Sequence, residues 1–367
     1  MVVPSMEPGG QEMVVARLAR GLRARGHDVG VTCIERVGAI GTALRDDGFN
    51  VQHVPTPGIR TIVRPAALEA WFASRRPDVI HTHSGAWLKG ARACHRAGAP
   101  RHVHTIHGLM DREPWHGPPL MRWASRYTSE IAAVSEPLHD YLRDVVQVRG
   151  TPIHLVPNGV DTQRFRPGPP TDAVRARFRL PPGTPVIGHV ARLAPIKNQA
   201  LLLHAFALLL ETRPDAFLAI VGDGPLRSTL DAQAAALGIA ARTGFLGHVA
   251  ELAPVYRDFD AFVLASLAEG TSISIQEAMA TGLPIVATAV GGTPDLLAHG
   301  DAGVLVPSND RTALANALRD VLADAALRDR IAGAARRRAS AVYGEETMLD
   351  QYEALYHGAR VPVRSAG

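Results

Sequence analysis

Short apolar runs alternate with helix-type patterns along the chain, and this alternation limits its possible folds more than any other feature. Strands that alternate with helices build parallel sheets, because each helix carries the chain back to begin the next strand in the same direction. The expected fold class is therefore α/β. The runs are DVGVTCI, PDVIHTH, RHVHTIH, EIAAVS and IHLVPN in the first half, and PVIGHVA, AFLAIVG, RTGFLG, AFVLAS and LPIVAT in the second.

The runs form two sets, separated by a stretch without a strand pattern. This stretch, DTQRFRPGPPTDAVRARFRLPPGTP, is rich in proline and arginine, so we expect a linker with a short helix. A chain of 367 residues suits two domains, each with its own core. We predict two doubly wound, Rossmann-like domains, residues 1–165 and 166–345, that face each other across a cleft. Ligand is expected at the carboxyl ends of the strands.

The two ends of the chain carry their own patterns. Only MVV precedes Pro4, so the first strand is expected to be short or truncated. Residues 346–367 are predicted to form a helix that crosses back to the first domain, plus a tail. Apolar residues at helical spacing follow the Gly9-Gly10 turn, at Val14, Val15, Leu18 and Leu22. The same spacing recurs in TMLDQYEALYHG, at Met348, Tyr352 and Leu355.

Composition points to a folded chain in a reducing compartment. Hydrophobic residues make up 46% and charged residues 20%, which excludes a disordered chain. Two cysteines, Cys33 and Cys94, do not make a disulfide framework or a metal-binding spacing. The sequence has no apolar run long enough to span a membrane, and its first residues do not resemble a signal peptide. We therefore predict a cytoplasmic protein.

Positive charge is concentrated in the first half. Residues 1–165 hold 20 Lys and Arg against 15 Asp and Glu, a balance of +5, and the remainder holds 19 against 20. This excess favours an anionic or membrane-borne partner approached from the first domain, with the protein peripheral at the inner face of the cell membrane. The alternative is that the arginines only solvate helices. No nucleic-acid partner is predicted. The candidate rim cations are Arg17, Arg20, Arg23 and Arg122.

Two glutamates eight positions apart, Glu269 and Glu277 in AEGTSISIQEAMATG, are the strongest functional signal. Carboxylates bind hydroxyl groups, and the small-residue turn between them should open a helix whose free N–H groups attract an anion. The turn is Gly270, Thr271 and Ser272. An alternative remains open, since Ser274 and Glu277 also fit the S-x-x-E capping box, in which the glutamate only satisfies the helix's own donors.

A basic pair upstream favours the ligand-binding interpretation. Arg192 and Lys197 stand in HVARLAPIKNQ, and Lys197 is one of only two lysines, with Lys89, among 39 basic residues. A compact ammonium and a planar guanidinium together suit a diphosphate. The combination predicts a site for a nucleotide diphosphate-sugar.

At this point the chain resembles the retaining glycosyltransferases of family 4, the group 1 enzymes of bacterial polysaccharide and glycolipid assembly. The resemblance covers nearly the whole chain and implies the GT-B fold of two Rossmann-like domains. In one departure, Thr271-Ser272 stands where many members have Phe-Gly. The motifs that carry it are PGGQE, HTIHG, VPNGVDTQRFRPG, ARLAPIKN, VGDGP, FLGHV and EGTSISIQEAMATGLPIVAT followed by VGGTPDLL.

The resemblance also implies roles for individual residues. Arg192 and Lys197 would bind the donor diphosphate, Glu277 the ribose hydroxyls and Glu269 the sugar hydroxyls. His107 matches the family's active-site histidine of the first domain. The remaining donor-binding residues are Gly10 in the first domain and Gly222, Val249, Gly270, Thr271, Ser272 and Ile273 in the second. Sugar configuration would be retained, and no catalytic base is assigned.

Several motifs invite other interpretations. His81 with His83, and His102, His104 and His107, have strand-alternating spacing, but no carboxylate or cysteine set completes a metal site. Asp258-Phe259-Asp260 imitates a metal-binding DxD, although its place before a strand favours a structural role. We therefore expect no metal or other cofactor.

Two other functions fit the same site. A nucleotide-sugar epimerase of the same fold would need no acceptor, and a nonenzymatic nucleotide-sugar-binding protein would not turn over. The predicted partners are a nucleotide-sugar donor and a glycan or lipid-linked acceptor. Transfer to that acceptor is the primary prediction.

Overall fold

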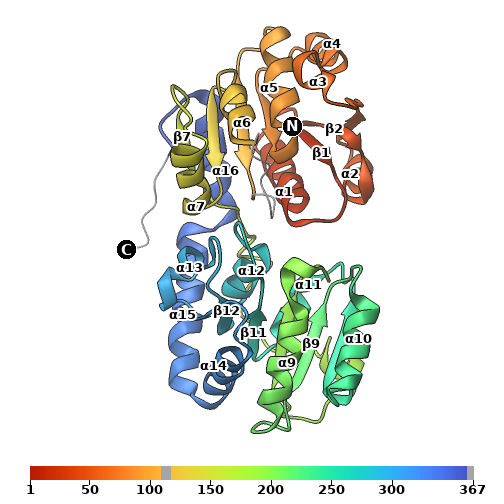
Figure 1. Cartoon of the computed structure of the whole chain (residues 1–367), viewed down its shortest axis with the longest axis vertical. Helices are drawn as coiled ribbons and strands as arrows, with labels where there is room; N and C mark the ends of the chain where they lie inside the picture. Colours follow the sequence, from red (N-terminus) through yellow and green to blue (C-terminus); the bar gives the residue numbers. More distant parts are fainter. Residues whose placement is uncertain (109–116, 362–367) are drawn as a thin grey trace. The chain divides into compact units, whose positions relative to one another are not determined.

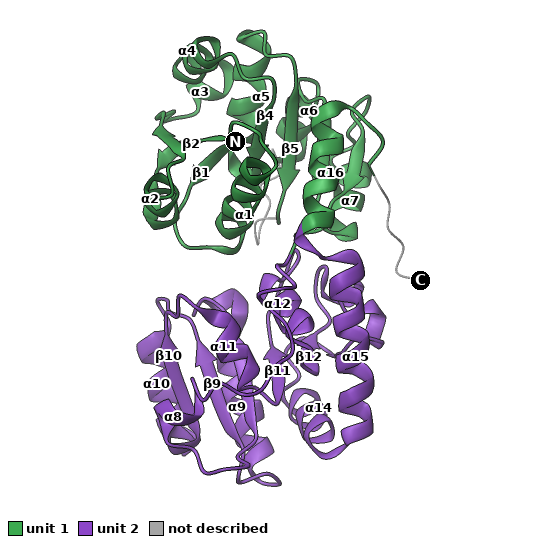
Figure 2. Cartoon of the chain, turned by 180° about the vertical axis from the view of Figure 1, so that it is seen from behind, with its two compact units in different colours: residues 1–159, 346–363 green, residues 160–345, 364–367 purple. Residues whose placement is uncertain are grey.

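The computed structural model describes residues 1–108 and 117–361, which form two compact α/β units (Figure 1, Figure 2). Unit 1 comprises Met1–Gly159 and the segment that starts at Glu346, and unit 2 is Val160–Glu345. The predicted boundary after residue 165 is wrong by a few residues. The Val160 N–H donates to the Tyr343 carbonyl at 2.7 Å, and Phe165 is buried in the core of unit 2. The predicted tail from residue 362 lies outside the described residues.

Unit 1 is built on a seven-stranded sheet of order β3-β2-β1-β4-β5-β6-β7, in which every pair is parallel. Strand order reverses beside β1, so β1 and β4 flank the point where ligands bind in open α/β sheets. The strands are β1 Val2–Ser5, β2 Gly30–Arg36, β3 Asn50–His53, β4 Ile80–His83, β5 His102–Ile106, β6 Glu130–Ala133 and β7 Ile153–Leu155.

The first strand is short, as predicted, and central to its sheet. Val2 pairs with β2 on one side and β4 on the other. The register with β2 shifts between Val3 and Ser5, at Pro4. Proline has no N–H to donate to a ladder, so the pairing with β2 is interrupted at this position.

Helices cover both faces of this sheet, and the first confirms its predicted apolar stripe. Val14, Val15, Leu18 and Leu22 are each at most 3% exposed. The helices of unit 1 are α1 Gly10–Ala24, α2 Gly38–Asp46, α3 Arg60–Val63, α4 Ala66–Arg75, α5 Trp87–Arg96, α6 Gly117–Ser125, α7 Glu136–Asp140 and α16 Glu345–His357.

The last helix, α16, packs on unit 1 next to β4 and β5. Its apolar side, Met348, Tyr352 and Leu355, is buried. The Tyr356 hydroxyl lies 2.7 Å from His81 Nδ1 on β4, and the Tyr352 hydroxyl lies 3.0 Å from Thr105 Oγ1 on β5. The end of the chain therefore completes the buried polar interior of unit 1.

Unit 2 is built on a six-stranded parallel sheet of order β10-β9-β8-β11-β12-β13. Its strands are β8 Val186–Val190, β9 Phe217–Val221, β10 Thr243–Gly247, β11 Ala261–Leu264, β12 Ile285–Thr288 and β13 Val304–Val306. Its helices are α8 Arg175–Phe178, α9 Gln199–Leu210, α10 Arg227–Ala236, α11 Leu252–Arg257, α12 Ile273–Thr281, α13 Thr293–Leu296, α14 Arg311–Ala323 and α15 Ala325–Val342. No helix in the described ranges combines the length and apolarity that a bilayer crossing requires.

The stretch predicted as a linker is fastened to unit 2. Asp258 is 1% exposed, and its carboxylate accepts from the backbone N–H groups of Thr171, at 2.6 Å, and Val174, at 2.7 Å. Asp260 accepts from the Val186 N–H at 2.8 Å. The DxD-like pair therefore has the structural role that its position favoured.

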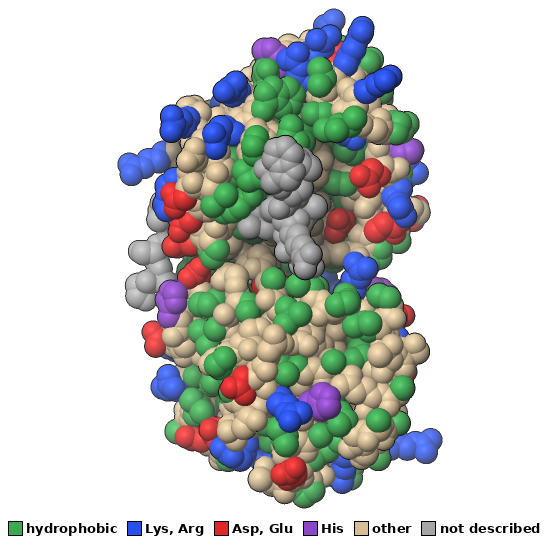
Figure 3. Space-filling model, in the orientation of Figure 1, with side chains coloured by type: hydrophobic (Ala, Val, Ile, Leu, Met, Phe, Trp, Pro, Cys, Tyr) green, Lys and Arg blue, Asp and Glu red, His purple; other side chains and the backbone are tan. Residues whose placement is uncertain are grey.

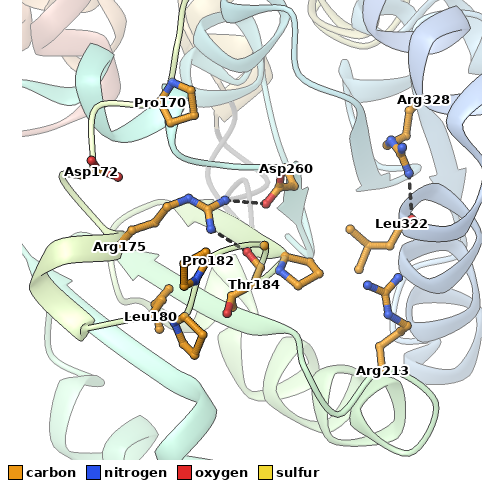
Figure 4. A pocket seen from close by; sticks show the side chains of 13 residues that line it. Pro170, Asp172, Arg175, Leu180, Pro182, Thr184, Arg213, Asp260, Leu322 and Arg328 are labelled. Atoms are coloured by element: carbon orange, nitrogen blue, oxygen red, sulfur yellow. Dashed lines mark hydrogen bonds and ion pairs between the residues drawn. The ribbon is translucent and has the colours of Figure 1, made fainter.

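A cavity of about 600 Å³ lies beside this stretch. Pro185 and Asp260 line it and immediately precede β8 and β11, so it opens at the amino ends of the strands. Figure 4 shows Arg175 reaching Asp260, at 2.9 Å, and Arg328 reaching the Leu322 carbonyl, at 2.7 Å. Both arginines hold the local structure together, and no predicted site residue lines this cavity.

Candidate functional site

The carboxyl ends of β8 and β11 bring together the predicted cation and carboxylate of unit 2. Lys197 Nζ lies 2.6 Å from Glu269 Oε1, and Ser266 Oγ donates to the same oxygen at 2.5 Å. The Leu267 N–H donates to the Ile196 carbonyl at 2.8 Å, which ties the two loops together. Strands β8 and β11 are neighbours in the sheet, so residues far apart in sequence meet at one edge.

The Glu269 carboxylate is nearly enclosed. Its side chain is 7% exposed, whereas that of Lys197 is 24% exposed. A buried carboxylate needs a compensating charge and hydrogen bonds, which Lys197 and Ser266 supply. The Lys197 ammonium carries three N–H donors and its side chain stays partly exposed, so it can also bind an anion.

Arg192 lies on the loop that follows β8, and a buried side chain of unit 2 binds its backbone carbonyl. Buried Gln199 donates through Nε2 to the Arg192 carbonyl at 2.9 Å and lies 3.3 Å from His189 Nε2. His189 Nδ1 lies 3.0 Å from the Val263 carbonyl, so Nδ1 carries the proton and Nε2 accepts. Burial lowers the pKa of His189 to about 4, which keeps this ring neutral. The Arg192 side chain is exposed and makes no ion pair with any residue in the described ranges.

Gly222 shapes the neighbouring loop through its backbone. Its φ of +124° is unfavourable for other residues, and a Cβ there would lie 2.1 Å from the Ala191 carbonyl oxygen. The Gly222 N–H donates to the Gly247 carbonyl at 2.9 Å. Val249 follows in the next loop, between β10 and α11, where it is half-buried against the core of unit 2.

The segment after Glu269 opens α12 as predicted. Ser272 is the N-cap, its hydroxyl accepts from the Ile275 N–H at 3.4 Å, and Ile273 is the first helical residue. Gly270 and Thr271 form the preceding turn. Gly291 packs against this turn so closely that a Cβ on Gly291 would lie 1.8 Å from the Glu269 carbonyl oxygen. The positive end of the α12 dipole therefore lies beside the Lys197–Glu269 pair.

The capping-box alternative for Glu277 is wrong. The cap is Ser272 and not Ser274, so Glu277 falls in the second turn of α12, beyond the position from which a glutamate can reach back to the cap. Its side chain is buried and accepts from the Tyr256 hydroxyl at 3.1 Å. The Glu277 carboxylate is therefore positioned by a side chain of α11 and is not used as a helix cap, so it can still bind a ligand.

Gly10 and His107 belong to unit 1, and the other predicted site residues belong to unit 2. Gly10 is the first residue of α1, after the strand end of β1. His107 follows β5, and its Nε2 lies 3.0 Å from Nδ1 of His83, the last residue of β4. Burial lowers the pKa of His107 to about 4 and that of His83 well below its ordinary value, so both rings are neutral near pH 7.

The other strand histidines bind neighbouring side chains. Thr82 Oγ1 lies 2.9 Å from both His102 Nε2 and His104 Nδ1. His81 Nδ1 contacts the Tyr356 hydroxyl. Within residues 1–108 and 117–361, no three His, Cys, Asp or Glu side chains are grouped as a metal site requires.

The predicted rim arginines are not a free basic face. Arg17 is only 9% exposed and donates to the Gly159 carbonyl at 3.3 Å. Arg20 pairs with Asp47 at 2.6 Å, and Arg23 donates to the Asp47 carbonyl at 2.8 Å. Arg122 Nε donates to a backbone carbonyl at 2.6 Å. All four are engaged within unit 1.

Comparison with known proteins decides the family. The model for glycosyl transferases group 1 matches residues 170–338, and that for glycosyltransferase family 4 matches residues 8–164. The chain is 32% identical to a GDP-mannose-dependent alpha-(1-6)-phosphatidylinositol monomannoside mannosyltransferase of Mycolicibacterium smegmatis, over 83% of each protein. This chain is a family 4 glycosyltransferase. It is also 31% identical to a D-inositol 3-phosphate glycosyltransferase of Stackebrandtia nassauensis, over 98% of this chain and 90% of that protein.

The fold of this glycosyltransferase is GT-B. The crystal structure of Anabaena Alr3699/HepE in complex with UDP is similar with a TM-score of 0.84 and 24% identity, over 97% of this chain and 98% of that one. Both units have the parallel Rossmann-like sheets that the sequence predicted. Ser266, Gln199 and His189 were not predicted, because each supports the site through tertiary contacts that no local motif records.

Proposed function

We propose that this glycosyltransferase moves a sugar, with retention of configuration, from a nucleotide diphosphate-sugar to a glycan or lipid-linked acceptor in cell-surface polysaccharide or glycolipid assembly. The observation that carries the proposal is the Lys197–Glu269 pair at 2.6 Å beside the start of α12. The names of the relatives support it, since one uses GDP-mannose and acts on a phosphatidylinositol mannoside.

The residues of unit 2 have distinct roles in this proposal. Lys197, exposed Arg192 and the N–H groups at the start of α12 bind the diphosphate. Glu269 accepts hydrogen bonds from sugar hydroxyls, and Glu277 accepts them from the ribose. In unit 1, His107 contacts the reacting sugar. The Gly9-Gly10 turn has no side chains, so its backbone can approach the phosphate closely.

The chemistry needs charge stabilisation more than it needs a protein nucleophile. The anomeric C–O bond to the diphosphate breaks, the acceptor oxygen bonds to the same carbon on the same face, and the leaving phosphate oxygen takes the acceptor's proton. Negative charge therefore develops on the diphosphate, where fixed cations and a helix dipole lower the barrier. We propose that no divalent metal is required, so that excess chelator leaves transfer unchanged.

Nucleotide release with and without acceptor tests the reaction type. A panel of UDP- and GDP-sugars is first screened by thermal shift, since a ligand at 100 times its Kd stabilises by about 2.7 kcal/mol. Release of nucleotide that depends on acceptor is the expected result. A changed sugar without acceptor would identify an epimerase, and binding without turnover would identify a nucleotide-sugar-binding protein.

A further inference from the structure

Two imidazole rings meet at the carboxyl ends of β4 and β5 in unit 1. His83, the last residue of β4, pairs in register with Thr105 of β5, which brings His107, two residues further along, beside it. His83 Nδ1 and His107 Nε2 lie 3.0 Å apart, and the ring centroids are 5.3 Å apart. Figure 3 shows histidine side chains at separate points on one outer face of the molecule, whereas His83 is fully buried. The contact therefore belongs to the interior of unit 1.

The position of the His83 ring is fixed by its neighbours. His81 packs against it with ring centroids 4.0 Å apart, and His81 is itself held by the Tyr356 hydroxyl and Thr105 Oγ1, each at 2.7 Å. Ser84, the next residue of the chain, has a φ of +39°, which serine rarely adopts. Strained backbone of this kind persists only where the surrounding structure enforces it.

The contact between the two rings holds a single proton, because both rings are neutral and a hydrogen bond needs one donor and one acceptor. The other nitrogen of His83, Nε2, is buried and has no hydrogen-bond partner among residues 1–108 and 117–361. A buried N–H without an acceptor is rarer in folded proteins than a buried acceptor without a donor. The His83 proton therefore lies on Nδ1 and is donated to His107 Nε2, so His107 carries its own proton on Nδ1.

We propose that His83 is a positioning residue for sugar transfer, because its Nδ1–H holds His107 in the Nδ1–H tautomer. The hydrogen bond that one ring nitrogen makes decides which nitrogen of a histidine is protonated. Free histidine favours the Nε2–H tautomer, so His107 needs this partner to keep its proton on Nδ1. The Nδ1–H is then the donor that His107 offers to a hydroxyl of the reacting sugar. This inference rests on the proposed function, in which His107 contacts that sugar.

A double-mutant cycle tests whether His83 acts through His107. His83→Leu removes the donor and should lower kcat/KM at least about tenfold, and His107→Leu should lower it about 10²-fold. The double variant should be no slower than His107→Leu alone, whereas independent effects would multiply. His83→Asn places an amide N–H where Nδ1 stood and should recover most of the rate.

The matched control is His102→Asn. His102 is also buried, lies on β5, and contacts Thr82 Oγ1 at 2.9 Å and the Tyr127 carbonyl at 3.1 Å. Because it does not contact His107, kcat/KM of this variant should stay within about twofold of the wild type. Melting temperatures of all variants show whether each one is folded.

The ring nitrogens give a second measurement, which needs no turnover. In protein labelled with ¹⁵N-histidine, the His107 signals should show the Nδ1–H tautomer in the wild type and in His83→Asn. In His83→Leu they should show the Nε2–H tautomer, which a purely structural role of His83 would not produce.

Three results would overturn the proposal. These are a double variant slower than His107→Leu by the full factor of His83→Leu, equal rate losses in His83→Asn and His83→Leu, and an Nε2–H tautomer of His107 in the wild type. Absence of transfer by the wild type with every donor would overturn the proposed function, and with it the role of His83 in transfer. The tautomer measurement distinguishes the two failures, because it does not depend on a donor.

Discussion

Lys197 Nζ and Glu269 Oε1 lie 2.6 Å apart, although 72 positions separate the two residues in sequence. Such a pair gives the site a cation whose position is fixed before any ligand arrives. It also gives a nearly buried carboxylate an ionic partner, so the same contact serves both the phosphate and the sugar side of the proposed donor.

Replacing Lys197 by alanine should reduce kcat/KM about 10²- to 10³-fold, because one fixed donor to the developing phosphate charge is lost. The chain should stay folded, since Ser266 still donates to Glu269. Lys197→Arg should recover only part of the rate, because a planar fork replaces a point charge. Arg227→Ala, which removes an exposed pair on α10, is the control. Steady-state kinetics near wild type for Lys197→Ala would remove the basis of the proposed function.

Glu277→Gln and Tyr256→Phe should each weaken donor binding about tenfold, the first by removing the charged acceptor and the second by removing the hydroxyl that orients it. Melting temperature should change little in Glu277→Gln, since glutamine still accepts from Tyr256. Calorimetric titration with the donor, paired with thermal melting, measures both quantities. A lower melting temperature with normal affinity would show that Glu277 acts only in packing.

Asp258→Asn should lower the free energy of unfolding by about 1–3 kcal/mol, because a buried carboxylate that accepts several N–H groups becomes a neutral amide with fewer acceptor sites. Turnover at moderate temperature should persist and should not respond to manganese. Urea unfolding and a chelator titration check these outcomes. Abolished activity that manganese restores would make the DxD-like pair a metal site.

Stability should fall as pH drops from about 6.5 to about 4. Burial lowers the pKa of His102, His107 and His189 to about 4, whereas an unfolded histidine titrates near 6.5. In this window the unfolded chain binds protons that the folded chain does not, so each histidine contributes a slope of up to about 1.4 kcal/mol per pH unit. Urea unfolding from pH 7.5 to 4.5 measures the slope. His189→Gln should flatten it by about one proton, and an unchanged slope would contradict the assignment.

The interior strands could be predicted from the sequence because they are buried on both faces of the sheet and therefore consist of continuous apolar runs. Eight of the ten apolar runs correspond to interior strands, where local composition reflects burial, and the other two, IHLVPN and RTGFLG, contain the edge strands β7 and β10. The strands that it missed are β3 and β13, which stand at the sheet edges. In β3 only Val51 is buried, so no apolar run marks it.

The candidate site residues that belong to a local sequence motif could be predicted. Those that act through contacts between distant parts of the chain could not. Residue type and spacing selected Arg192, Lys197 and Glu269 as candidates, and the structure brings Lys197 and Glu269 together. The S-x-x-E spacing at Ser274 suggested a cap that the fold places at Ser272, because the turn before α12 is set by its packing against Gly291. The rim arginines failed for a similar reason, since charge balance does not reveal which cations already have partners.

The return of α16 to unit 1 affects how the protein is made. Unit 2 is continuous in the chain, whereas unit 1 needs Tyr352 and Tyr356 to meet Thr105 and His81, which are translated more than two hundred residues earlier. During synthesis, unit 2 can therefore finish folding while the first unit still lacks its closing helix. A ribosome-bound chain halted before residue 345 should leave the His81 and Thr105 side chains of β4 and β5 without their α16 partners, which exposes this face of the sheet to chaperones until α16 is made.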